Sequence, residues 1–144
     1  MKHAWMGLLG AALLGTGCEI TYRGCTDPEA TNYDATADTD DGSCAYEGQA
    51  VFWYGASVAV DLDAYLSDTL TFYIDGEPML TAATDMYWSV APDCGDYNSY
   101  TITTSLTDGE ARVASYQVID NFDDVLWDGV VAFNLGGCTA IELD

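Results

Sequence analysis

Residues 69–80 read TLTFYIDGEPML, and this stretch decides the fold class. Leu70, Phe72 and Ile74 alternate with Thr69, Thr71 and Tyr73. Successive side chains of a β-strand point to opposite faces of its sheet, so the alternation predicts a strand with the three aliphatic and aromatic residues Leu70, Phe72 and Ile74 facing a core. The dipeptide Asp75-Gly76 tolerates positive φ at both positions, as a type I′ hairpin turn requires. The stretch therefore predicts a β-hairpin.

Short runs of the same kind follow one another to the end of the chain, separated by Gly, Asp and Asn, as strands joined by tight turns are. The expected strands are residues 49–54, 56–62, 69–74, 77–82, 86–90, 100–106, 110–119, 130–135 and 139–143. Asp108-Gly109 predicts a second hairpin turn. No long window has the apolar spacing of a helix. We expect residues 47–144 to form an all-β domain, an antiparallel two-sheet sandwich.

A pattern in the second half of the chain carries a resemblance. Pro92-Asp93-Cys94-Gly95 precedes a Thr-rich strand, and Trp127-Asp128-Gly129 precedes VVAFNLGGC. The pattern resembles a module of small bacterial surface lipoproteins that is similar to transthyretin-like (Ig-like) or carboxypeptidase-regulatory-like sandwiches. The resemblance covers residues 49–143 and implies about seven strands and a bridge between Cys94 and Cys138. It assigns no catalytic residue.

The first residues, MKHAWMGLLGAALLGTGC, have a short basic start, an apolar run and small residues before Cys18. The run is too short to span a bilayer but fits a secretory signal, which we place at residues 1–17. The junction resembles the lipobox of bacterial lipoproteins, although Gly15 stands where a large aliphatic residue is usual. We expect Cys18 to carry the lipid and residues 18–23 to form a tether. Cleavage near Gly17 by an ordinary signal peptidase is the alternative.

The cysteine count agrees with export and lipidation. There are five cysteines, and lipidation of Cys18 leaves an even four. Four cysteines allow three pairings. Bridges from Cys25 to Cys44 and from Cys94 to Cys138 are favoured, because each then closes within one compositional segment.

Residues 24–46 form a separate, acidic segment with few large apolar side chains. So small a segment cannot bury enough area to offset an ordering entropy of about 1–2 kcal/mol per residue. A disulfide closing a loop of this length contributes only about 3 kcal/mol. Bound Ca²⁺ would add to this, since calcium takes six to eight oxygen ligands. The candidate ligands are Asp27, Asn32, Asp34, Asp38, Asp40 and Asp41.

The bracketed pattern resembles cysteine-bracketed, calcium-binding-like repeats of exported bacterial proteins, which are loosely akin to thrombospondin type 3 repeats. Its spacing does not match an EF-hand loop, because DTDDG is not D-x-[DN]-x-[DN]-G and no Glu follows. The alternative is a disulfide-closed spacer whose aspartates serve turns and solvation. Both interpretations make the segment a stalk.

Charge excludes one class of partner. The chain carries 24 acidic residues against three basic ones, a net charge of −21. Such a field repels phosphate backbones and anionic headgroups, so we expect no nucleic acid and no electrostatic hold on a membrane. Solubility, or adaptation to a salty medium, explains the charge equally well.

Catalysis is not expected. The sole histidine, His3, and the sole lysine, Lys2, lie in the signal, so the mature chain lacks an imidazole base and an amine nucleophile. A carboxylate-based hydrolase remains as a remote alternative. Its only dense candidate cluster is Asp120, Asp123, Asp124 and Asp128.

Aromatic residues favour binding instead. In Trp53-Tyr54 and Tyr87-Trp88, one ring of each pair should face outward and could anchor a protein or a glycan. The alternative is that these rings form core. We expect a non-catalytic, lipid-anchored protein of the outer membrane in a Gram-negative-type envelope, periplasmic or surface-exposed, that binds an envelope protein or a glycan. A structural accessory subunit of an envelope assembly is the second hypothesis.

Overall fold

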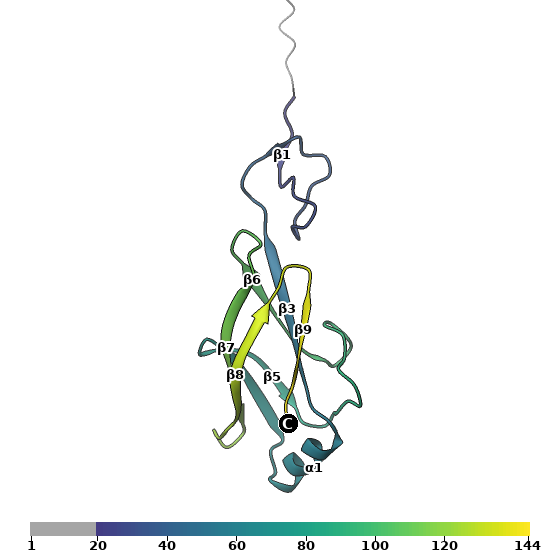
Figure 1. Ribbon diagram of the computed structural model, residues 1–144, viewed down its shortest axis with the longest axis vertical. Helices are drawn as coiled ribbons and strands as arrows, with labels where there is room; N and C mark the ends of the chain where they lie inside the picture. The colour runs from purple at the N-terminus through teal and green to yellow at the C-terminus, as the bar shows by residue number, and fades with distance from the viewer. Residues whose placement is uncertain (1–19) are drawn as a thin grey trace, which may run out of the picture.

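The computed structural model describes residues 20–144 and shows a seven-stranded sandwich with a stalk at one end (Figure 1). A three-stranded sheet has the order β6-β3-β9 and faces a four-stranded sheet of order β5-β4-β7-β8. The bounds are β3 Tyr46–Trp53, β4 Thr69–Ile74, β5 Glu77–Ala83, β6 Tyr100–Leu106, β7 Arg112–Asp120, β8 Val125–Phe133 and β9 Cys138–Glu142. The predicted all-β sandwich is confirmed.

The core lies between the two sheets and uses the face of β4 that the sequence predicts. Leu70, Phe72 and Ile74 are all buried there. Phe52 of β3 meets Phe72 across the sandwich, with ring centroids 5.3 Å apart. Tyr100 of β6 packs on the same ring at 5.4 Å. Period-two alternation is thus sufficient to place these side chains.

The two Asp-Gly turns have the predicted backbone but only one joins a hairpin. Asp75 and Gly76 have φ of 49° and 83°, and β4 pairs with β5 in antiparallel fashion. Asp108 and Gly109 have φ of 52° and 73°. However, β6 and β7 belong to different sheets, so the expected second hairpin is wrong. The turn crosses from one sheet to the other, because a local turn signal does not specify the pairing partner.

The expected strand at residues 56–62 is instead helix α1, Ala56–Ala64. Its apparent alternation hides a helical spacing: Val58, Ala59 and Leu62 all pack against the core. The helix carries the chain from β3 in one sheet to β4 in the other. The helix covers the end of the sandwich. Its packing against the core outweighs the strand propensity of its valines.

The expected strand at residues 86–90 is also wrong, because this segment is irregular. It lies in the connection from β5 to β6, which passes between sheets and leaves no neighbouring strand to pair with. The Trp88 backbone N–H donates to the carbonyl of Tyr54 at 3.0 Å. The Trp88 ring packs on Tyr100 at 5.0 Å. An apolar run can therefore cover a core without forming a strand.

The sandwich is not wholly antiparallel, because β3 pairs with β9 in parallel. A tight connection at residues 134–137 joins β8 to β9, so β9 reverses direction relative to β8 in the adjoining sheet. Gly137 N–H donates to the carbonyl of Asn134 at 3.1 Å in this connection. The reversal places β9 parallel to β3, a relation that no local sequence pattern encodes.

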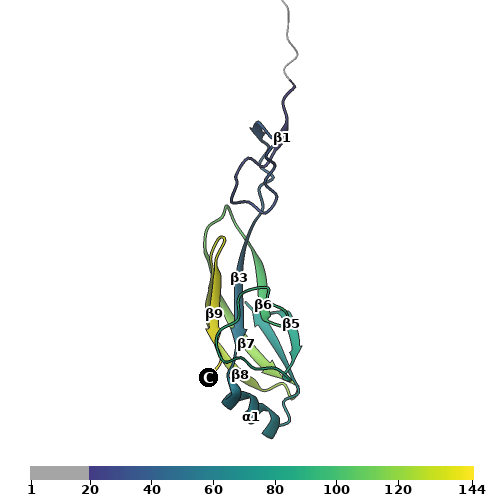
Figure 2. The same cartoon turned by 90° about the vertical axis from the view of Figure 1, so that its right-hand side faces the viewer.

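The stalk extends from the end of the sandwich opposite α1 (Figure 2). It contains two short strands, β1 (Arg23–Gly24) and β2 (Thr39–Asp40), which pair in parallel. The chain then runs directly into β3 at Tyr46. The sandwich therefore has a stalk end and a distal end, and helix α1 lies at the distal end.

Candidate binding cleft

A cleft of about 440 Å³ opens at the distal end of the sandwich, between α1, the β7–β8 turn and the last residues of the chain. We call it the distal cleft. Its lining is largely aliphatic and aromatic, with carboxylates among these side chains. The lining residues are Val58, Asp61, Leu62, Tyr65, Ser67, Asp120, Phe122, Asp124, Leu126, Trp127 and Asp144.

Helix α1 supplies one wall through a single face. Val58, Asp61, Leu62 and Tyr65 follow one another at i, i+3, i+4 and i+7, a spacing that brings side chains to one side of a helix. The helix ends at Ala64, and Leu66, two residues later, has a left-handed φ of 59°. The Tyr65 side chain, which lines the cleft, is 75% exposed, and the neighbouring Leu66 side chain is 67% exposed.

The β7–β8 turn supplies the facing wall and is held by Asp120. One carboxylate oxygen of Asp120 accepts hydrogen bonds from the backbone N–H groups of Phe122 at 2.9 Å and Asp124 at 3.0 Å. The other accepts the hydroxyl of Ser67, beyond α1, at 3.0 Å. Asp120 therefore fixes the turn and also ties it to the helical wall.

The same bonds set the ionisation of Asp120. Burial raises the pKa of this carboxyl, but the hydrogen bonds from Phe122 N, Asp124 N and Ser67 Oγ outweigh burial and hold the pKa below its ordinary value. The carboxylate is thus charged at neutral pH although only 8% of the residue is exposed.

Two further contacts hold the walls together. The Asn121 side-chain oxygen accepts the backbone N–H of Asp68 at 2.8 Å, and its amide donates to the carbonyl of Leu66. The Trp127 indole N–H donates to the backbone carbonyl of Asp144 at 3.1 Å. The cleft is therefore built from cross-links between three segments that are far apart in the sequence.

The cleft was not predicted, although signals for it were present. Phe122 is a large ring inside the acidic turn DNFDD and is 56% exposed. The i, i+4, i+7 spacing of Val58, Leu62 and Tyr65 marked a helical face. The strand prediction for residues 56–62 concealed that spacing.

The predicted aromatic pairs lie outside the distal cleft. Tyr54 is fully buried, so its ring cannot contact a ligand, and Trp53 is partly buried. Tyr87 is 58% exposed, whereas Trp88 packs edge-on against Tyr54 with centroids 6.1 Å apart. Each pair has a more exposed and a more buried ring, but the inward rings belong to the core and do not form a platform.

The acidic cluster considered for hydrolysis is split by the turn. Asp120 is buried and engaged in three hydrogen bonds, while Asp123, with φ of 67°, and Asp128 are exposed. Asp124 lines the cleft beside Asp120. Of the four residues, only Asp120 and Asp124 therefore lie at the cleft.

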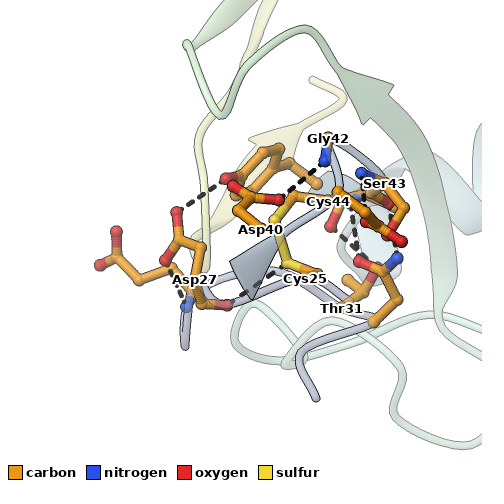
Figure 3. Close-up of a disulfide and its surroundings, with 12 residues drawn as sticks. Cys25, Asp27, Thr31, Asp40, Gly42, Ser43 and Cys44 are labelled. Atoms are coloured by element: carbon orange, nitrogen blue, oxygen red, sulfur yellow. Dashed lines mark hydrogen bonds between the residues drawn. A yellow bond between two sulfur atoms is a disulfide. The ribbon is translucent and has the colours of Figure 1, made fainter. Parts of the chain in front are cut away.

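The candidate calcium ligands mostly serve local turns in the stalk (Figure 3). Side-chain oxygens of Asp27, Asp34, Asp40 and Asp41 each accept the backbone N–H of the residue two positions ahead, at 2.8–2.9 Å. These are Asx turns. Asp38 accepts the Thr39 hydroxyl. Within residues 20–144, no three His, Cys, Asp or Glu side chains converge where they could hold a metal ion.

Asn32 and Asp27 connect the stalk to its own exit and to the sandwich. Asn32 accepts Ala45 N–H at 2.7 Å and donates to the carbonyl of Ser43 at 2.6 Å. The Tyr46 hydroxyl, at the start of β3, donates to Asp27 at 2.7 Å. That hydrogen bond, with burial and nearby aspartates, raises the pKa of Tyr46 to about 12.

Both favoured disulfides are present. The disulfide between Cys25 and Cys44 closes the stalk (Figure 3), and the two Cα atoms are 4.8 Å apart. Cys94 and Cys138 tie the connection between β5 and β6 to the start of β9, with Cα atoms 5.7 Å apart. The signal at residues 1–17 and the lipidation site Cys18 lie outside the described residues.

Comparison with known proteins assigns no family. No family model matches the chain, and no solved structure matches it. A stretch of 38 residues is 75% identical to chloroplastic ribulose bisphosphate carboxylase/oxygenase activase 1 of Larrea tridentata, covering 26% of this chain and 8% of that protein. A stretch of 24 residues is 75% identical to the activase of Spinacia oleracea, covering 17% and 5%.

These matches are too short to carry a fold or an activity to this chain, which spans less than a tenth of either relative's length. Among residues 20–144, no helix has the length and apolar character needed to cross a membrane.

Proposed function

We propose that this protein is a non-catalytic binding module of the cell envelope, attached to the outer membrane by lipid on Cys18 and binding an envelope protein or glycan at its distal end. The distal cleft is the observation that carries the proposal. Helix α1, which lines the cleft, lies at the end of the sandwich farthest from the stalk (Figure 1), and in an anchored molecule that end points away from the anchor.

The exposed side chains around the cleft support a binding role. Tyr65 and Phe122 both line the cleft and are each more than half exposed. Apolar groups clustered around a pocket are typical of ligand or protein sites, whereas scattered ones are ordinary. Hydrogen bonds of Asp120 and Asn121 hold the two walls of the cleft together before a ligand binds, which lowers the entropy cost of binding.

A photo-crosslinking experiment tests the location of the site. A photoreactive phenylalanine replaces Tyr65 in the anchored protein, and a matched control replaces Tyr97, which is 90% exposed and does not line the cleft. We expect crosslinks to an envelope component from position 65 and not from position 97. Equal crosslinking from both positions, or none from either, contradicts the proposal.

A second experiment tests the anchor separately. The wild-type chain should fractionate with membranes and carry fatty acids on Cys18, while Cys18→Ser should be released and unmodified. Intact mass spectrometry measures the acyl mass directly. A Cys18→Ser protein that still fractionates with membranes would refute lipid attachment at that residue.

A further inference from the structure

We infer that the distal cleft binds a basic, apolar peptide segment, with a Lys or Arg side chain held by the cleft carboxylates and a neighbouring apolar side chain packed on the exposed rings. This inference rests on the proposed binding function and names its partner class as protein. The occupant follows from three properties of the cleft: its polar chemistry, its shape and its charge.

Apart from the Tyr65 hydroxyl, which can donate or accept, the free polar groups of the side chains that line the cleft are hydrogen-bond acceptors. Among the described residues, the Ser67 hydroxyl is donated to Asp120 and the Trp127 indole to the Asp144 carbonyl. The remaining carboxylates, on Asp61, Asp124 and Asp144, are exposed and have no donor from this part of the chain. Ammonium and guanidinium groups carry donors and no acceptors, so they complement this set. Sugar hydroxyls are both donors and acceptors and match it less well.

The apolar surface requires more than a free cation. Phe122 comes from the β7–β8 turn and Leu126 from the start of β8, and on the other side Val58 and Leu62 come from α1 and Tyr65 directly follows it. A cation can lie over the Tyr65 or Phe122 ring, where the electron-rich face of the ring attracts it. The aliphatic side chains of the cleft are covered only if the same ligand also carries an apolar side chain. A peptide with alternating basic and apolar residues supplies both.

The acidic cleft is also complementary in charge to a basic ligand. None of the lining residues is Lys or Arg. In the described chain the only basic residues are Arg23, in the stalk, and Arg112, which pairs with Asp75 at 2.6 Å on the sandwich. A net charge of −21 attracts basic partners from a distance, and the carboxylates of the cleft then hold them in place.

Titration with labelled peptides tests the inference on the mature chain with both disulfides intact. The probe is a peptide of alternating Leu and Lys. A Gly and Lys peptide has the same charge without apolar groups, and a Leu and Glu peptide reverses the charge. We expect the first to bind at least tenfold more tightly than the second and the third not to bind.

Matched variants locate the binding. Phe122→Ser should weaken the Leu and Lys peptide about tenfold, and Tyr97→Ser, at a similarly exposed ring elsewhere, should leave it unchanged. Asp61→Asn with Asp124→Asn should weaken it about tenfold. Asp108→Asn with Glu110→Gln removes the same charge at the stalk end and should change it less than twofold.

The outcomes separate this inference from the function on which it rests. Equal effects of the two charge-removing pairs would mean diffuse attraction and would overturn the inference. A second outcome is that the protein binds neutral oligosaccharides and no peptide, with Phe122→Ser abolishing that binding. This result would overturn the inferred partner class but would still support a binding function at the distal cleft. Failure of both ligand classes, with no crosslinking from position 65, would overturn the proposed function as well.

Discussion

Asp120 is the one buried acidic residue among residues 20–144. It is 8% exposed and accepts three hydrogen bonds that hold the β7–β8 turn and join it to Ser67. Asp120→Ala leaves two backbone N–H groups without their acceptor. We expect a loss of about 2–3 kcal/mol in the free energy of unfolding, measured by urea denaturation. Asp63→Ala, at an exposed carboxylate on α1, is the control and should change it by less than about 0.5 kcal/mol.

The contribution of Asp120 to the free energy of unfolding should depend on pH. The pKa of Asp120 is lowered in the folded protein from an ordinary value of 3.8. Its contribution is therefore complete above that value and is lost as the pH falls through the lower, folded pKa. The difference in stability between wild type and Asp120→Ala should narrow under those acid conditions. A difference that stays constant down to pH 2 would show that the carboxylate charge has no part in it.

Gly48 occupies a position in β3 that no other residue can fill without a shift. A Cβ atom there would lie 2.8 Å from the Cβ of Phe133 and 3.0 Å from its carbonyl carbon, and the backbone of β8 cannot easily move. Gly48→Ala should therefore cost about 1–3 kcal/mol by overpacking. Gly55→Ala is the matched control, because the nearest atom to its Cβ is 3.9 Å away. Equal unfolding midpoints for the two variants would contradict this account.

At the scale of elements, the sequence predicts individual strands from their alternating side chains, but it does not predict which strands far apart in the sequence pair with each other. Residues 69–74 and 100–106 form the expected strands without a change of bounds, because each alternates between core and surface. The strand predictions for residues 56–62 and 86–90 are wrong, because these segments connect the two sheets and their apolar side chains cover the core without joining a sheet. The distal cleft was missed for the same reason: it is assembled from α1, the β7–β8 turn and the final residues, and their proximity is a property of topology.

The stalk offers an element-scale prediction. Its turns are closed by hydrogen bonds to aspartates, and its ends are joined by the Cys25–Cys44 bridge. We expect reduction to speed protease cleavage within residues 26–43 at least tenfold, while a calcium chelator leaves the rate unchanged, because these hydrogen bonds and the bridge need no ion. Cleavage sites and rates can be followed by mass spectrometry.

Wild type with Ca²⁺ added is the comparison that matters for the stalk. Slower cleavage with Ca²⁺ than with Mg²⁺, reversed by chelator, would establish the calcium site that the acidic pattern predicts. The sandwich itself should resist cleavage with Ca²⁺, with Mg²⁺ and with chelator alike, since none of these breaks its Cys94–Cys138 bridge.

The charge of the whole molecule adds self-repulsion to these local terms. With a net charge of −21, the carboxylates of one compact domain lie in each other's field, and within residues 20–144 Arg112 and Asp75 form the only salt bridge. Unfolding separates the charges and so relieves the repulsion. Salt screens it, since the Debye length falls from about 30 Å at 0.01 M to about 10 Å at 0.1 M.

Stability should therefore rise with ionic strength. We expect the urea midpoint at neutral pH to increase steadily from 0.01 to 0.5 M NaCl and then level off, because screening beyond that range adds little at the spacing of surface charges. At pH 3, where carboxylates approach neutrality, the increase should shrink. KCl at equal ionic strength is the control for ion-specific effects and should match NaCl. A midpoint that is flat or falls with either salt would mean that the acidic side chains are already compensated in the folded state, and the long-range attraction invoked for basic partners would lose its basis.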